Sequence, residues 1–145
     1  MAEASQGMTF PLKITTMDRG LRFDGVAEKV ILRTVTGDVA ILPQHTDFIA
    51  SLGMGEILVE TNGQRKRGVC IGGIVTVTGG HVTLLPTTFE WAEEIDPERA
   101  RQAEAMARKT LAAPESFVEE ALAQAHLKRA LLRQKVFDDQ IAAAP

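Results

Sequence analysis

Apolar and polar residues alternate in short runs along the N-terminal part of the chain, up to about Pro86. Such runs, separated by Gly, Asn or Pro, are typical of strands in an antiparallel sandwich or barrel. The first three cover residues 11–17, 27–35 and 38–42. We therefore predict an all-β N-terminal sandwich of antiparallel strands over residues 8–92.

Two β-hairpins are marked by their turn residues. Asn62-Gly63 separates two strand-like runs, and Gly79-Gly80 separates the next two. Both pairs tolerate the positive φ angles of a tight primed turn. Around the second turn, valines and leucines alternate with threonines, which predicts one apolar face and one face that can meet water.

After Trp91 the spacing of apolar residues changes from that of strands to that of helices. Asp96 suits a helix N-cap, Pro97 suits the first helical position, and Glu98 favours the positive end of the helix dipole. We predict a helix from there to about Ala112, before Pro114.

A second, longer helix follows. Ser116 and Glu119 have the spacing of a capping box, and the helical pattern continues to about Phe137. The two helices together predict a C-terminal α-helical hairpin over residues 93–140.

The contact surface of this hairpin is predicted to be small. Apolar residues of the second helix recur at steps of four and three, interrupted by one arginine: Val118, Leu122, Ala125, Arg129, Leu132 and Val136. The first helix presents mainly alanines: Ala100, Ala103 and Ala107, with Leu111. Because alanines bury little apolar area, we expect a weakly docked hairpin that can move.

Composition and charge exclude several classes. With 16 Lys and Arg against 19 Asp and Glu, the net charge is −3, so no overall field favours a nucleic-acid partner. No run of about 18 uncharged apolar residues occurs, so we expect no membrane insertion. Cys70 is the only cysteine, which excludes an internal disulfide and suits a reducing compartment. Its apolar neighbours place it in the core.

No catalytic constellation emerges from the motifs. The sequence lacks a phosphate loop, a nucleophile elbow and an H-E-x-x-H motif. His45, His81 and His126 show no metal-ligand spacing, so we predict no metal and no enzyme activity of the chain alone. We interpret Arg65-Lys66-Arg67 as a solvated strand edge, with a specific anion site as the alternative.

Several segments, in order and spacing, resemble the epsilon subunit of rotary F-type ATP synthases. The segments are Phe23-Asp24-Gly25, residues 28–35, Gly37 to His45, residues 52–57, Gly72-Gly73 and residues 81–86. The resemblance extends from about Thr9 to Val136. The chain departs from it at Ala40, where members usually carry Gly, at Gln44, which is often Gly, and at residues 46–48.

The resemblance implies a non-catalytic rotor subunit. The sandwich would grip the gamma subunit and rest on the c-ring, with Asp38 and His45 at the c-ring interface, during proton- or sodium-driven ATP synthesis. The hairpin would either fold against the sandwich or extend into the head of alpha and beta subunits, where it blocks ATP hydrolysis. The implied location is the cytoplasmic side of a bacterial plasma membrane, peripheral through the complex.

Some members of this family bind ATP without hydrolysing it, as a regulatory ligand and not as a required cofactor. The resemblance assigns seven residues to such a site: Glu90, Ile95, Asp96, Arg99, Ala100, Arg129 and Arg133. Arginines at i and i+4 share a helix face and can present paired donors to phosphate. Met106 stands where binding members have a further arginine, while Arg108 is rotated by two positions.

These residues can also be explained without ATP. Asp96 is explained by capping, Arg99 by a solvated first turn, and the second-helix arginines by packing against an acidic partner. At the level of the whole chain, the alternative function is a free-standing soluble nucleotide-sensing sandwich with a helical lid.

Overall fold

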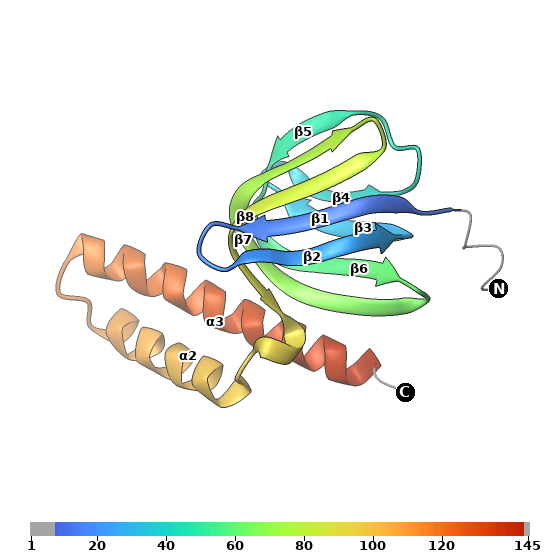
Figure 1. The fold of residues 1–145 in the computed structure, drawn as a ribbon. Coiled ribbons are helices and arrows are strands. Elements are labelled where there is room, and N and C mark those ends of the chain that lie inside the picture. The colour runs from blue at the N-terminus through green and yellow to red at the C-terminus, as the bar shows by residue number, and fades with distance from the viewer. Residues whose placement is uncertain (1–7, 144–145) are drawn as a thin grey trace. The chain divides into compact units, whose positions relative to one another are not determined.

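The computed structural model describes residues 8–143, which form eight strands followed by helices (Figure 1). The chain divides into two compact units, with the boundary between Trp91 and Ala92. The N-terminal unit holds all of the strands, and the C-terminal unit holds the helices. The predicted all-β sandwich and helical hairpin are confirmed.

The strands pair antiparallel with one exception. Their bounds are β1 Phe10–Thr16, β2 Gly20–Ala27, β3 Lys29–Thr34, β4 Gly37–Ile41, β5 Phe48–Ser51, β6 Met54–Thr61, β7 Gln64–Thr78 and β8 His81–Trp91. The order is β2-β1-β8-β7-β6-β3-β4, and β5 pairs with β7. Only the pairing of β1 with β8 is parallel among the described strands.

The long strand β7 belongs to both layers of the sandwich. Its first half pairs with β6, and residues 74–77 pair with β5. Between the halves, Gly72 and Gly73 have φ angles of 69° and 99°. A Cβ at Gly73 would overlap the carbonyl oxygen of Leu85. Glycine is therefore required where β7 bends between layers.

The two predicted turns are confirmed. Asn62 and Gly63 have φ angles of 52° and 73°, as a type I′ turn requires. Gly79 and Gly80 have φ angles of 57° and 81°. The runs on both sides of Gly72 were predicted as separate strands, but they are one strand because the bend does not interrupt pairing with β8.

The core lies between the two layers. It is built from alternate positions of the strands, and includes Leu12, Ile14, Val30, Leu32, Ile41, Ile57, Val59, Val75, Val77 and Leu84. Cys70 is in this core, as predicted, and burial raises the pKa of its thiol to about 12. Thr61 Oγ1 donates a 2.7 Å hydrogen bond to the Val26 carbonyl, which joins β6 to β2.

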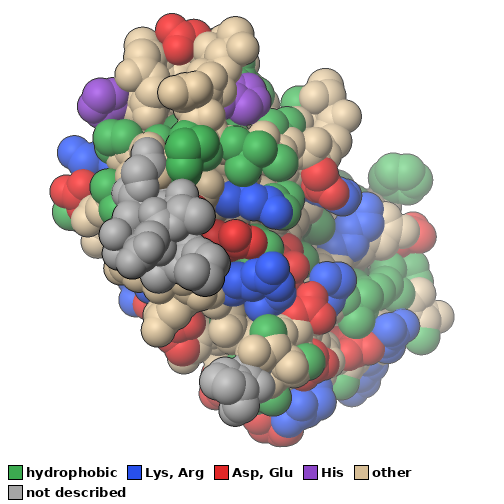
Figure 2. Space-filling model, turned by 90° about the vertical axis from the view of Figure 1, so that its right-hand side faces the viewer, with side chains coloured by type: hydrophobic (Ala, Val, Ile, Leu, Met, Phe, Trp, Pro, Cys, Tyr) green, Lys and Arg blue, Asp and Glu red, His purple; other side chains and the backbone are tan. Residues whose placement is uncertain are grey.

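Charged side chains on the sandwich pair across strands. Lys29 lies 3.9 Å and Arg65 3.3 Å from the carboxylate of Glu60. Figure 2 shows the same mixture on one face of the molecule, where acidic and basic side chains are interspersed. Arg65 is exposed, but Lys66 and Arg67 are half-buried, so the predicted solvated edge describes only the first residue of that cluster.

The helical unit begins with a 3₁₀ turn, η1 (Ala92–Glu94), followed by α2 (Pro97–Ala112) and α3 (Phe117–Ala143). Asp96 Oδ1 accepts the backbone N–H groups of Glu98 and Arg99 at 3.1 and 3.2 Å, which confirms the predicted N-cap. Ser116 Oγ accepts the N–H of Glu119 at 3.0 Å at the start of α3. Helix α3 continues six residues beyond its predicted end.

Alanines form most of the seam of the hairpin. The predicted α3 seam is confirmed at Val136 but is wrong at Val118, Leu122 and Arg129. Helices α2 and α3 pack along each other (Figure 1). The buried residues of α2 are Ala100 and Ala107, and those of α3 are Ala123, Ala130 and Val136. Val118 and Leu122 are 68% and 56% exposed, and Arg129 is exposed. Alanine facing alanine lets two helices approach closely, which turns the larger α3 side chains outward.

Candidate functional site

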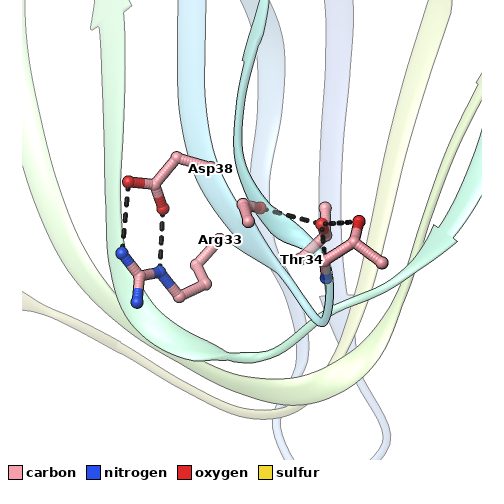
Figure 3. A network of polar contacts seen from close by, with 5 residues as sticks. Arg33, Thr34 and Asp38 are labelled. Carbon is pink, nitrogen blue, oxygen red and sulfur yellow. Dashed lines mark hydrogen bonds and ion pairs between the residues drawn. The ribbon is translucent and has the colours of Figure 1, made fainter.

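The first candidate residue, Asp38, lies at the turn between β3 and β4. Arg33 donates to both of its carboxylate oxygens, at 2.8 and 3.2 Å (Figure 3). The two residues are directly opposite each other in the ladder. The hydrogen bonds from Arg33 lower the pKa of the Asp38 carboxyl. Both side chains are exposed, so this end of the hairpin presents a fixed ion pair to solvent or to a partner.

Thr34 fixes the backbone of the same turn. Its hydroxyl donates to the Gly37 carbonyl at 2.8 Å and accepts the Thr36 N–H at 3.3 Å (Figure 3). Thr34 itself is buried. The Arg33–Asp38 pair therefore stands on a rigid hairpin.

His45 lies at the other end of β4. The backbone N–H of His45 donates to the Leu42 carbonyl at 3.2 Å and closes a turn with Pro43 and Gln44 at its two central positions. Gln44 has a φ of 66°, so this is a type II turn, whose third position favours glycine. The His45 ring lies 5.2 Å from that of Phe48. Asp38 and His45 thus bracket the strand β4, and the structure does not bring them together.

Six of the seven candidate nucleotide residues lie in the helical unit. Ile95 and Ala100 are 5% and 4% exposed and act as packing residues. The Asp96 carboxylate is used by the helix cap. Arg99 and Arg129 are exposed, and Arg133 is half-buried.

Glu90 is the seventh residue and belongs to the other unit. It lies on β8, opposite Val69 of β7, and is half-buried.

A groove of about 430 Å³ runs between α2 and α3. It is lined by Ala103, Met106, Ala107, Thr110, Glu119, Leu122, Ala123 and His126. None of the candidate nucleotide residues lines it. Helical spacing nevertheless puts Arg99 on the flank of α2 that carries Met106, and Arg129 and Arg133 on the flank of α3 that carries Leu122 and His126. The three arginines therefore continue this face of the hairpin toward the start of α2.

The opposite flank carries a polar contact that the sequence pattern did not indicate. Gln134 Nε2 on α3 donates to Glu104 Oε1 on α2 at 2.8 Å, and Arg108 Nε donates to the other Glu104 oxygen at 2.8 Å. These two hydrogen bonds lower the pKa of Glu104, with that from Gln134 as the larger cause. The i, i+4 spacing of Glu104 and Arg108 indicates their pairing from the sequence, but no sequence pattern indicates that Gln134 bonds to Glu104. Arg108 is therefore held away from the groove and does not replace an arginine at position 106.

Between residues 8 and 143, no group of three or more His, Cys, Asp or Glu side chains could hold a metal ion. The helices of the same region include none with the length and hydropathy needed to cross a membrane.

Comparison with known proteins covers both units. Residues 9–92 match the family model for the ATP synthase delta/epsilon chain β-sandwich domain, and residues 93–137 match that for its long α-helix domain. The ATP synthase epsilon chain of Ruminococcus albus is 37% identical over 128 residues, or 88% of this chain and 95% of that one. That of Caldanaerobacter subterraneus is 36% identical over 129 residues, covering 88% and 93%.

A solved structure has the same fold. A chain in the Euglena gracilis mitochondrial ATP synthase, in an assembly of OSCP, F1 and c-ring, aligns with a TM-score of 0.67 at 23% identity, covering 93% of this chain and 81% of that one. The fold, both family models and the relatives agree, and the chain therefore belongs to the ATP synthase delta/epsilon family, as a non-catalytic subunit of the central stalk.

Proposed function

We propose that this chain couples the gamma subunit to the c-ring and restrains ATP hydrolysis through its helical hairpin. The observation that carries the proposal is the alanine seam between α2 and α3 in a unit separate from the sandwich. A seam of small residues contributes little burial energy. The large apolar side chains Met106, Phe117, Val118 and Leu122 remain exposed, and would bury additional area on the alpha and beta subunits when the hairpin extends.

Association with gamma tests this function. The chain and gamma, expressed together, should elute as one complex in size-exclusion chromatography. Elution of this chain as an autonomous monomer beside folded gamma would contradict the proposal. Because both units match one family, the free-standing sensor has no separate observation in its favour.

For the c-ring contact, we propose Asp38 and His45 as interface residues, on the cytoplasmic face of a bacterial membrane. Single cysteines at either position should crosslink to the polar loops of the c subunits in the assembled enzyme. Since the two residues lie at opposite ends of β4, unequal crosslinking identifies the end that faces the ring. Cys70 should give little background, because it is only 4% exposed.

A cysteine at the exposed Gln64, the first residue of β7, is the control. Labelled cysteines at both Asp38 and His45 that form no adduct with c subunits would refute this placement.

For the hairpin, we propose that ATP binds along the flank carrying Arg99, Arg129 and Arg133, with Glu90, Ile95, Asp96 and Ala100 completing the site. A ligand that binds only the folded hairpin stabilises it by RT ln(1 + [L]/Kd), about 2.7 kcal/mol at a hundredfold excess over Kd. That is enough to shift a weakly packed element.

Calorimetry of the isolated chain tests ATP binding. Arg129→Ala should abolish the heat of binding, and Arg65→Ala, in the sandwich, should leave it unchanged. Met106→Arg should tighten binding, because position 106 lines the groove on the flank of Arg99. If the wild-type chain gives no heat and no chemical-shift change with millimolar ATP, capping alone explains Asp96.

A further inference from the structure

The last residue of the sandwich, Trp91, is held by side chains from two other strands. Lys66 Nζ of β7 lies 4.2 Å from the centre of its ring. Phe89 contacts the indole edge-to-face at a centroid distance of 4.8 Å, and Phe23 of β2 lies 6.1 Å away. The indole Nε1–H donates to the Arg22 carbonyl at 3.3 Å, and Trp91 is only 6% exposed.

A second contact reinforces the same strand end. The Arg22 guanidinium donates to the Phe89 carbonyl at 3.1 Å and lies 5.4 Å from the Phe89 ring. Opposite Trp91, Gly68 allows a close approach, because a Cβ there would lie 2.7 Å from the Glu90 carbonyl oxygen. We refer to Arg22, Phe23, Lys66, Phe89 and Trp91 as the Trp91 clamp.

The end of β8 needs such a clamp. Strand β1 pairs with β8 only at residues 82–84, whereas β7 pairs with it up to Trp91. In the sheet ladder, residues 88–91 therefore pair with β7 and lie beyond the paired part of β1. A strand end with one partner frays easily unless side chains hold it. Immediately afterwards, Ala92 begins the second compact unit.

We propose that the Trp91 clamp is the fixed stop of a hinge, so that movement of the helical unit is confined to residues after Trp91 and never unzips β8 from β7. The inference rests on the proposed function only in requiring a helical unit that moves. Side chains from β2 and β7 together hold the end of β8 in the sheet when the helical unit moves. Lys66 is half-buried, and its ammonium over the indole face is the contact of the clamp that a single substitution can remove.

Hydrogen exchange of the full chain, followed by mass spectrometry, tests the clamp. In the wild type, the amides of residues 88–91 that bond to β7 should be protected while those of 93–96 exchange faster. Lys66→Ala should accelerate exchange at 88–91 by roughly 2- to 30-fold, the range of a cation–π contact. Arg65→Ala removes the neighbouring charge without touching Trp91, and should leave these amides unchanged.

Trp91 is the only tryptophan of the chain, so its emission reports the same event. Lys66→Ala should shift that emission to the red, and Trp91→Phe, which keeps the ring but loses the bond to Arg22, should also accelerate exchange at 88–91. Unchanged exchange in both variants, or wild-type exchange at 88–91 as fast as at 93–96, would overturn the proposal. The experiment uses the isolated chain, so its failure is distinguishable from loss of hydrolysis control in the assembled enzyme.

Discussion

At the scale of single residues, Gln44 carries a conformation that its side chain opposes. Its φ of 66° lies in the left-handed region, where a Cβ crowds the following carbonyl. The turn closes through the His45 N–H and places Gln44 at the third position of a type II turn. The family often has glycine at this position, so the departure at Gln44 strains the turn. The strands on both sides of the turn are intact.

We therefore expect Gln44→Gly to stabilise the chain. The gain should be about 1 kcal/mol in the free energy of unfolding, since glycine adopts this φ without a steric cost. Urea denaturation measures it. Gln44→Ala is the matched control, because alanine keeps the Cβ, and a gain of the same size in that variant would contradict the explanation.

Glu104 connects the two helices through polar side chains. Its folded-state pKa is depressed by Gln134 and Arg108. A depressed pKa stabilises the hairpin above the ordinary carboxyl pKa of 4.5, and that contribution is lost as the pH falls through the folded-state value. Acid should therefore loosen the pairing of α2 with α3.

The expected effect of Glu104→Gln is a hairpin whose helicity changes less between neutral and acidic pH. Circular dichroism during thermal melts at several pH values measures this. Glu98→Gln is the control, because the Glu98 carboxylate pairs with Arg101 of its own helix. Equal pH responses in the Glu104 variant and the wild type would show that another group governs the hairpin.

At the scale of elements, local chemistry predicted more than side-chain period did. The two glycine turns and the Asp96 cap were predictable, because each depends on a few adjacent residues. Strand β2 was missed, since its two glycines and one aspartate have low strand propensity and its exposure hardly alternates. Strand β5 was missed as well, because it is only four residues long.

The hairpin seam shows why a periodic pattern of large residues can mislead. The pattern favoured Val118 and Leu122, but tertiary packing selected Ala123 and Ala130, seven residues apart. No property of α3 alone distinguishes these solutions; the alanines of α2 decide between them. For the same reason, Arg129 lies outside the seam, on the face that its i, i+4 spacing with Arg133 had already indicated.

A substitution within the seam tests this packing. Ala130 is 1% exposed, so Ala130→Leu should destabilise the hairpin by about 1 to 3 kcal/mol through overpacking. Ala121→Leu, on the exposed side of α3, should change the stability by less than about 0.5 kcal/mol. Thermal unfolding followed by helical circular dichroism provides the comparison, and equal effects of the two substitutions would place the seam elsewhere.

At the scale of the whole molecule, we propose that the two units have different tasks. The sandwich is built from a continuous core and rigid turns, as the attachment to a rotor requires. The helical unit has a thin seam and exposed apolar side chains, as a regulatory element with two docking states requires. The boundary at Trp91 separates these tasks along the chain.

Truncation after Ala92 in the assembled enzyme tests this division most directly. The sandwich alone should support assembly and proton or sodium coupling, so ATP synthesis should remain close to that of the full-length subunit. ATP hydrolysis should rise, because the hairpin that restrains it is gone. Hydrolysis that stays unchanged under both activating and non-activating conditions, in a complex that assembles normally, would contradict the regulatory role of the hairpin.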